Sequence, residues 1–266
     1  MSTKNKETHT MESKKVVIHL KNINKTFKLK DASTDSIRDR IFSIFSDSKL
    51  RSLKALQNVN LDIYKGEFFG IIGHNGSGKS TLLKIIMGAF PPDEGGEVEV
   101  NGKIIRLALG MGFDPNLTAR ENIYINGSVL GLTFREIGEA FHQIIEFAEL
   151  ENFVDTQVKF YSTGMRSRLA FGVAIHAKAD IFLMDEFFGG VGDISFRKKS
   201  EEIFQKSVVE GRTIIHVSHQ LQTIKRHCNR VLLLHQGQVV TIDTPEVVIP
   251  LYRQLMEKKK QKQKKV

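Results

Sequence analysis

The sequence predicts an α/β protein built on a largely parallel, buried sheet, with an additional antiparallel β part and an inserted helical subdomain. Short, continuously apolar segments alternate with helical patterns, among them 181–185 (IFLMD), 213–217 (TIIHV) and 231–235 (VLLLH). Continuous apolar strands between helices are typical of a parallel sheet that is covered on both faces. From Thr118 to about Ala177 the pattern is helical, which predicts the inserted subdomain.

The first half of the chain contains further strands, and a hairpin there supplies the antiparallel part. Apolar patterning predicts strands over 16–23, 59–64 and 68–73. Glycine and proline residues in 90–103 predict a loop that leads into a hairpin. Residues 31–55 interrupt these strands with a helical pattern whose apolar side chains share one face. This amphipathic insertion either packs on the core or docks at a membrane boundary, and the pattern leaves both roles open.

Composition is typical of a globular protein in a reducing compartment. The chain has 266 residues, enough for a large core, and its single cysteine, Cys228, cannot form an internal disulfide. No apolar run is long enough to span a bilayer. Residues 1–15 are polar, which predicts a disordered leader and not a signal peptide. We therefore expect the protein on the cytoplasmic side, where any action at a membrane passes through partners.

The basic charge is concentrated at one end. Six lysines lie between Lys258 and Lys265, and without them the net charge falls from +9 to about +3. Such a tail is a solvated end or, alternatively, a weak contact with anionic lipid. Aromatic residues are not interleaved with the basic ones and no nucleic-acid-binding module is present, so we expect no nucleic-acid partner.

A phosphate-binding loop follows the strand at 68–73. The segment GHNGSGKST fits the pattern G-x-x-x-x-G-K-[ST] between a strand and a helix. Its glycines let backbone N–H groups surround phosphate oxygens, and the helix dipole adds positive potential. Lys79 is expected to reach the β- and γ-phosphates and Ser80 to ligate Mg²⁺. The expected binding residues are Gly73, His74, Asn75, Gly76, Ser77, Gly78, Lys79, Ser80 and Thr81.

Acidic residues complete a hydrolytic set. Asp185 ends an apolar strand, where it can orient Mg²⁺, and the adjacent Glu186 is placed to polarise an attacking water. His219, after the next apolar strand, is predicted to sense the γ-phosphate or orient that water. The chain lacks the Asn/Thr-Lys-x-Asp guanine reader and the GxGxxG dinucleotide fingerprint. ATP with Mg²⁺ is therefore the predicted cofactor.

A second candidate anion site lies at Tyr161–Met165, YSTGM, which opens an apolar-striped helix. A helix N-terminus that begins in Ser-Thr-Gly suits a phosphate. Ser162 can equally act as the helix N-cap, and the two roles are compatible.

Taken in order, the phosphate loop, YSTGM, the Asp185–Glu186 pair, Asp193 and His219 resemble the ATPase subunits of ABC transporters. The resemblance covers 16–254. The family signature usually reads LSGGQ, and the variant YSTGMRSRLAFGVA is similar to the polysaccharide-exporter branch, which serves capsule, O-antigen and teichoic acid export. The glutamine that the family carries in its coupling loop is missing from 107–113, where we place that loop.

The resemblance implies a P-loop NTPase of the ABC ATPase type with a RecA-like core. The core would comprise 16–112 and 178–245, with 31–55 as the amphipathic insertion. The helical subdomain with the signature would be 113–177. A C-terminal helix and the lysine-rich tail would occupy 246–266.

The resemblance also implies residue roles and partners. Two copies would form a homodimer around two ATP molecules, with Ser162 and Gly164 of each copy contacting the ATP of the other. Asp193 would lie in a short acidic loop near the nucleotide. Phe27 would stack on adenine, although Tyr64 is an alternative and Phe27 also fits an ordinary core position.

The implied function is ATP hydrolysis that drives export of a lipid-linked polysaccharide. The partner would be an integral membrane permease in two copies, which places the protein peripherally at the cytoplasmic face of the inner membrane. The alternative is a soluble ABC-type ATPase with a regulatory or assembly role. Stable co-purification with a membrane subunit distinguishes the two.

Overall fold

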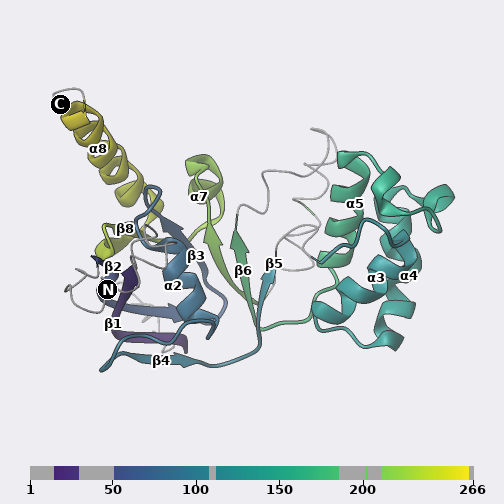
Figure 1. Ribbon diagram of the computed structural model, residues 1–266, viewed down its shortest axis with the longest axis horizontal. Helices are drawn as coiled ribbons and strands as arrows, with labels where there is room; N and C mark the ends of the chain where they lie inside the picture. The colour runs from purple at the N-terminus through teal and green to yellow at the C-terminus, as the bar shows by residue number, and fades with distance from the viewer. Residues whose placement is uncertain (1–14, 30–50, 108–111, 186–201, 203–210, 264–266) are drawn as a thin grey trace, which may run out of the picture.

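The computed structural model describes residues 15–29, 51–107, 112–185, 202 and 211–263. Helices α3, α4 and α5 gather on one side of strands β5 and β6, and helix α2 and a small sheet lie on the other side (Figure 1). Within the described ranges, no helix combines the length and the apolar character needed to cross a bilayer.

The central sheet has six strands in the order β5-β6-β7-β3-β8-β9. The strands are β5 (Ile104–Leu107), β6 (Ile181–Asp185), β7 (Thr213–Val217), β3 (Phe68–Ile72), β8 (Arg230–His235) and β9 (Gln238–Asp243). All neighbours pair in parallel except β8 and β9, which pair antiparallel. The mostly parallel sheet expected from the apolar segments is therefore confirmed.

A second sheet is antiparallel and has the order β2-β1-β4. Its strands are β1 (Val16–Leu29), β2 (Arg51–Tyr64) and β4 (Glu97–Val100). The expected hairpin after 90–103 is wrong. Strand β4 pairs with β1, whereas β5, the next strand along the chain, pairs in parallel with β6. The short link 101–103 carries the chain from one sheet to the other, and the Lys103 N–H anchors it by donating to Asp180 Oδ2 at 2.7 Å.

Residues 51–55 also differ from expectation, because they belong to strand β2 and not to a helical insertion. They extend the pairing of β2 with β1, with Leu53 opposite Phe27 and Arg51 opposite Leu29. The helical period at 51–55 is too short to compete with these backbone hydrogen bonds. The rest of the insertion, 30–50, lies outside the described residues.

Helices of different length connect and cover the strands. They are α2 (Lys79–Ile86), α3 (Ala119–Val129), α4 (Phe134–Ala148), α5 (Thr163–Ala174), α7 (Leu221–His227) and α8 (Pro245–Gln263), with 3₁₀ turns at Glu151–Phe153 and Val158–Phe160. Thr118 and Thr133 start α3 and α4 with capping boxes, in which the threonine and a glutamate three residues later satisfy each other's backbone N–H groups.

Two apolar cores lie against opposite faces of the central sheet. Alternate residues of β3 separate between them: Phe69 and Ile71 join the core that contains α2, and Phe68 and Ile72 join the core that contains α3–α5. Successive strand side chains point to opposite faces, so a strand buried on both sides must be apolar throughout. Because both faces of the sheet are packed, the strand ends from which the functional loops emerge are held in fixed positions.

Candidate nucleotide-binding site

Three strands deliver the predicted residues to one edge of the sheet. Asp185 pairs in register with Val217, and Val217 pairs with Ile71. Gly73 lies two residues beyond Ile71, and His219 lies two residues beyond Val217. The parallel register therefore places the phosphate loop, His219 and the end of β6 along the same carboxyl edge, which is where ligands bind in open α/β sheets.

The phosphate loop has a conformation that requires glycine. A Cβ on Gly73 would lie 2.3 Å from the Leu234 carbonyl oxygen and 2.5 Å from Ser77 Oγ. Gly78 has φ +108°, and a Cβ there would lie 2.6 Å from the Ala55 carbonyl oxygen. Close approach and a left-handed backbone thus explain these two glycines. The loop leads directly into helix α2, whose N-terminal N–H groups are suited to bind an anion.

Lys79 is held inside this loop. Its Nζ donates to the carbonyl oxygen of Gly73 at 2.6 Å and to that of His74 at 3.1 Å, and the residue is buried. Ser77 is fully buried, and its Oγ has no hydrogen-bond partner among the described residues. Because no surface of Ser77 is exposed, a ligand would be held by the backbone N–H groups of the loop and by the N-terminus of α2. The loop therefore fits a phosphate group.

A pocket of about 400 Å³ opens in front of the loop. It is lined by Phe27, Leu53, Lys54, Ala55, Asn75, Gly76, Ser77, Gly78, Lys79, Ser80, Thr81, Val217 and His219. The structure thus brings Phe27 and His219 together with the phosphate loop, although they are far apart in the sequence. A half-buried aromatic ring at one wall and a phosphate loop at the other suit a nucleotide with a base and a phosphate chain.

Tyr64, the alternative aromatic, does not line this pocket. It ends strand β2, and the guanidinium of Arg230 lies 5.2 Å from its ring centroid. Gly73 and His74 contribute carbonyl oxygens to Lys79 and form the start of the loop behind the pocket.

Sequence reasoning missed the wall formed by Leu53, Lys54 and Ala55. These residues reach the pocket because β2 begins at Arg51 and sets Leu53 opposite Phe27. Leu53 stays 52% exposed, which leaves an apolar surface beside the Phe27 ring. The helical pattern assigned to 31–55 concealed them, and only the strand pairing shows their position.

Replacing Gly78 by alanine is expected to destabilise the fold and to weaken nucleotide binding. The substitution adds left-handed strain of about 1–2 kcal/mol and a clash with the Ala55 carbonyl. Gly66 is the matched control, because its φ is +74° but no atom lies within 4 Å of a Cβ there. Urea unfolding should show a clearly larger loss for Gly78→Ala than for Gly66→Ala. Equal losses would contradict the role of the close approach.

The predicted signature segment lies elsewhere in the chain. Ser162 is the N-cap of α5, and its Oγ accepts a hydrogen bond from the Met165 N–H at 3.1 Å. Gly164 follows in the first turn of α5. Helix α5 lies across β5 and β6 from α2 (Figure 1), and neither Ser162 nor Gly164 lines the pocket. Within one chain, the structure therefore does not bring the signature residues to the phosphate loop.

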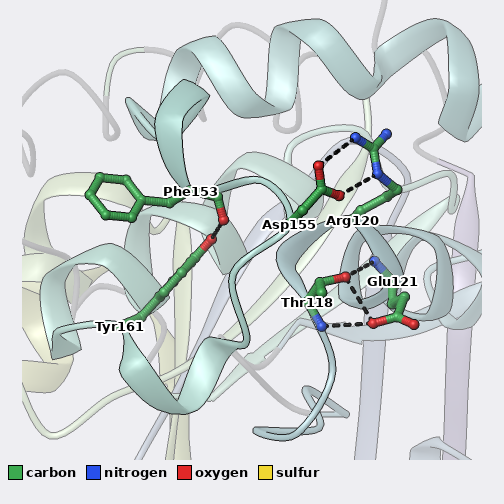
Figure 2. Close-up of polar contacts among 6 residues, drawn as sticks. All are labelled: Thr118, Arg120, Glu121, Phe153, Asp155 and Tyr161. Carbon is green, nitrogen blue, oxygen red and sulfur yellow. Dashed lines mark hydrogen bonds and ion pairs between the residues drawn. The ribbon is translucent and has the colours of Figure 1, made fainter.

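Tyr161 anchors the start of this segment (Figure 2). Its Oη donates to the Phe153 carbonyl oxygen at 2.6 Å, and burial raises the pKa of the phenol to about 12. Nearby, the Arg120 guanidinium pairs with both oxygens of Asp155 at 2.8 and 3.2 Å. These bonds tie the 151–161 connection to itself and to α3, so the N-terminus of α5 is held in place.

The Tyr161→Phe variant is expected to lose about 1 kcal/mol of unfolding free energy, because the phenol hydrogen bond to Phe153 disappears while the buried ring is kept. Tyr124→Phe is the control, since Tyr124 stacks on Phe134 and its hydroxyl makes no hydrogen bond within the described part of the chain. Chemical denaturation measures both. Indistinguishable losses would show that the Tyr161 bond contributes nothing.

Several predicted positions lie outside the described residues. These are Glu186, Asp193 and most of the 107–113 loop. Asp185 is described, as the last residue of β6. The functional roles of Glu186, Asp193, the 107–113 loop and Asp185 stay predictions from the sequence.

The parallel sheet, the phosphate loop at its carboxyl edge and the pocket define a nucleotide-binding protein of the P-loop class. The family model for ABC transporters matches residues 56–189. This chain belongs to the ABC transporter family.

Relatives agree with this assignment. The chain is 38% identical over 245 residues to the teichoic acids export ATP-binding protein TagH of Enterococcus faecalis, covering 92% of this chain and 54% of that protein. It is 37% identical over 244 residues to an O-antigen export system ATP-binding protein, RfbB of Klebsiella pneumoniae, covering 90% of this chain and 98% of that protein. The chain therefore spans about half the length of the teichoic acid export relative.

A solved structure shares the fold. It is a dimeric ATP-binding cassette in a post-hydrolysis state bound to ADP and Pi, with a TM-score of 0.63 and 26% identity. The match covers 86% of this chain and 98% of that one. The expected fold, a P-loop NTPase of the ABC ATPase type, is thereby confirmed.

Proposed function

We propose that this chain is the ATP-hydrolysing subunit of an ABC exporter that moves a lipid-linked polysaccharide through a separate membrane subunit. The observation that carries the ATPase part is the pocket that unites Phe27, the phosphate loop and His219. The cargo part rests on the relatives, whose names describe teichoic acid and O-antigen export.

Each of the predicted residues is proposed to have a separate role in binding or hydrolysing ATP. Phe27 would stack on adenine, and Lys79 and the loop N–H groups would hold the phosphates. Ser80 and Asp185 would hold Mg²⁺, which when bound neutralises charge on the phosphate oxygens. Glu186 would take a proton from the attacking water, and His219 would orient that water or sense the γ-phosphate.

Because Ser162 and Gly164 lie away from the pocket of their own chain, we place them on the nucleotide of a second copy. Ser162 Oγ and the N–H groups at the start of α5 would donate to the γ-phosphate there. A two-fold homodimer would then enclose two nucleotides with identical interfaces. The dimeric cassette structure supports this arrangement. Asp193 would lie close to the same interface.

The dimer would transmit its opening and closing to an integral membrane permease, present in two copies. Loss of the γ-phosphate removes the contact with Ser162 and Gly164, so hydrolysis opens the dimer. The protein would then sit peripherally at the cytoplasmic face of the cell membrane. The lysine-rich tail would add a weak contact with anionic lipid there.

Affinity purification of the tagged chain from detergent-solubilised native membranes tests the exporter proposal. We expect one integral membrane protein to co-purify at equal stoichiometry, and the complex to hydrolyse ATP. Recovery from the cytosol alone, with ATPase activity retained, would overturn the transport part and favour the regulatory or assembly role.

Deletion of residues 35–48 tests the insertion separately. If this segment docks at the membrane boundary, deletion should abolish export and leave basal ATP hydrolysis intact. Loss of both activities would show instead that the segment packs on the core. Polysaccharide at the cell surface and phosphate release report the two outcomes.

A further inference from the structure

A second, larger cavity lies at the opposite edge of the central sheet from the phosphate loop. Its volume is about 1030 Å³, and it includes residues at the amino ends of β6 and β7 together with the link that precedes β5. The link that leads from helix α5 into β6 reaches the sheet at this edge (Figure 1). None of the residues given a role in ATP binding lines this cavity.

Basic side chains outnumber acidic ones in the lining. Five cations, from Lys15, Lys65, Lys103, Lys178 and Arg212, surround the cavity together with two carboxylates, from Glu136 and Asp180. A concave site with an excess of one charge focuses the electrostatic potential more strongly than a flat surface does. The excess therefore favours an anion that carries several charges.

Both carboxylates are already engaged. Glu136 pairs with Lys178 and accepts from the Thr133 N–H at 2.8 Å, and these contacts lower its pKa to about 2. Asp180 Oδ2 accepts from the Lys103 N–H at 2.7 Å. Each carboxylate thus serves to fix the wall of the cavity.

The other cations of the lining are available to bind an anion. Within the described residues, the ammonium groups of Lys15, Lys65 and Lys103 have no acidic partner. The Arg212 guanidinium donates to the Ala177 carbonyl oxygen at 3.1 Å and lies 5.3 Å from the Phe182 ring centroid, so it is oriented, and no carboxylate of the described residues neutralises it.

The backbone also leaves room for one of these ammonium groups. Gly131, in the link between α3 and α4, has φ +87°, and a Cβ there would lie only 2.1 Å from Lys103 Nζ. Lys103 therefore reaches from the link between the two sheets to the helical region. An anion held by Lys103 would touch both parts of the molecule.

We propose that this cavity binds a small oligophosphate anion, at a site separate from the nucleotide pocket. Several ammonium groups at separate corners suit a chain of phosphates, whose oxygens accept from more than one lysine at once. The bound anion would bridge the sheets and the helical region. Any effect on ATP turnover rests on the proposed ATPase function, but the binding itself does not.

Titration calorimetry with tripolyphosphate on the full chain tests this proposal. Saturating MgADP occupies the phosphate loop during the titration. We expect one tripolyphosphate per chain, and an affinity that falls about tenfold or more when Lys65→Glu and Lys103→Glu are combined. Combined Lys84→Glu and Lys225→Glu give the same charge change outside the cavity, so this control should keep most of the affinity.

Hydrogen exchange under the same conditions locates the ligand. Tripolyphosphate should protect amides in 101–103 and 178–181 and leave those in 73–81 unchanged. Absence of binding in the presence of MgADP, an equal loss in the control variant, or protection confined to 73–81 would each overturn the proposal. Binding of a long polyanion such as heparin or of phosphatidate vesicles, without tripolyphosphate binding, would overturn it too. If ATP does not bind the wild-type protein but tripolyphosphate protects 101–103, the proposed ATPase function is contradicted and the proposed oligophosphate site is supported.

Discussion

Lys79→Ala is expected to lower ATP hydrolysis by about 10²–10³-fold, the usual cost of removing one preorganised hydrogen-bond donor. Two losses combine. The ammonium that would contact the β- and γ-phosphates disappears, and so do the hydrogen bonds from Nζ to the carbonyl oxygens of Gly73 and His74 that shape the loop. Phosphate release and fluorescent-nucleotide binding measure the effect on turnover and on affinity.

Lys84→Ala is the matched control for this prediction. Lys84 lies on the same helix, α2, but it is exposed and does not line the pocket. Its ammonium lies 5.0 Å from the Phe90 ring centroid, so its removal should cost at most about 1 kcal/mol of stability. Activity of Lys84→Ala should match wild type. Comparable loss in both variants would mean that helix α2, and not the Lys79 charge, governs activity.

Glu186→Gln is expected to convert the chain into a stable dimer in the presence of MgATP. The amide cannot accept the proton of the attacking water, so ATP persists and keeps the two copies together. Adding Ser162→Arg should return the protein to monomer, because a bulky cation would replace the hydroxyl that caps α5 and that we propose to contact the partner's nucleotide. Sedimentation velocity with and without MgATP reports both states.

Ser128→Arg introduces the same side chain elsewhere in the helical region. Ser128 is exposed on α3 and donates to the Tyr124 carbonyl oxygen at 2.9 Å, so its replacement should leave the Glu186→Gln dimer intact. A dimer that survives Ser162→Arg would contradict the placement of Ser162 at the partner's γ-phosphate. A Glu186→Gln protein that dimerises only in the complete membrane complex would assign dimerisation to the permease.

Much of this protein is determined by its sequence alone. The pattern GHNGSGKST specifies its own local structure, because glycine spacing, a lysine and a hydroxyl leave a phosphate-binding loop as the consistent arrangement. Continuous apolar segments such as TIIHV likewise require burial on both faces, which predicts a parallel sheet. Ser162 as a helix N-cap was also readable, since the preference depends on neighbouring residues only.

Only the tertiary structure decided which distant residues share a surface. Leu53 reaches the nucleotide pocket because it pairs with Phe27, and the local helical period of 31–55 gave no sign of that pairing. Strand β4 joined β1 instead of forming a hairpin with the next strand, since parallel pairing of β5 with β6 fills the edge of the central sheet. Strand pairing likewise brings Lys15, Lys103 and Arg212, which are far apart in the sequence, to the wall of one cavity. Local propensities act over a few residues, whereas pairing and packing choose among partners separated by tens of residues.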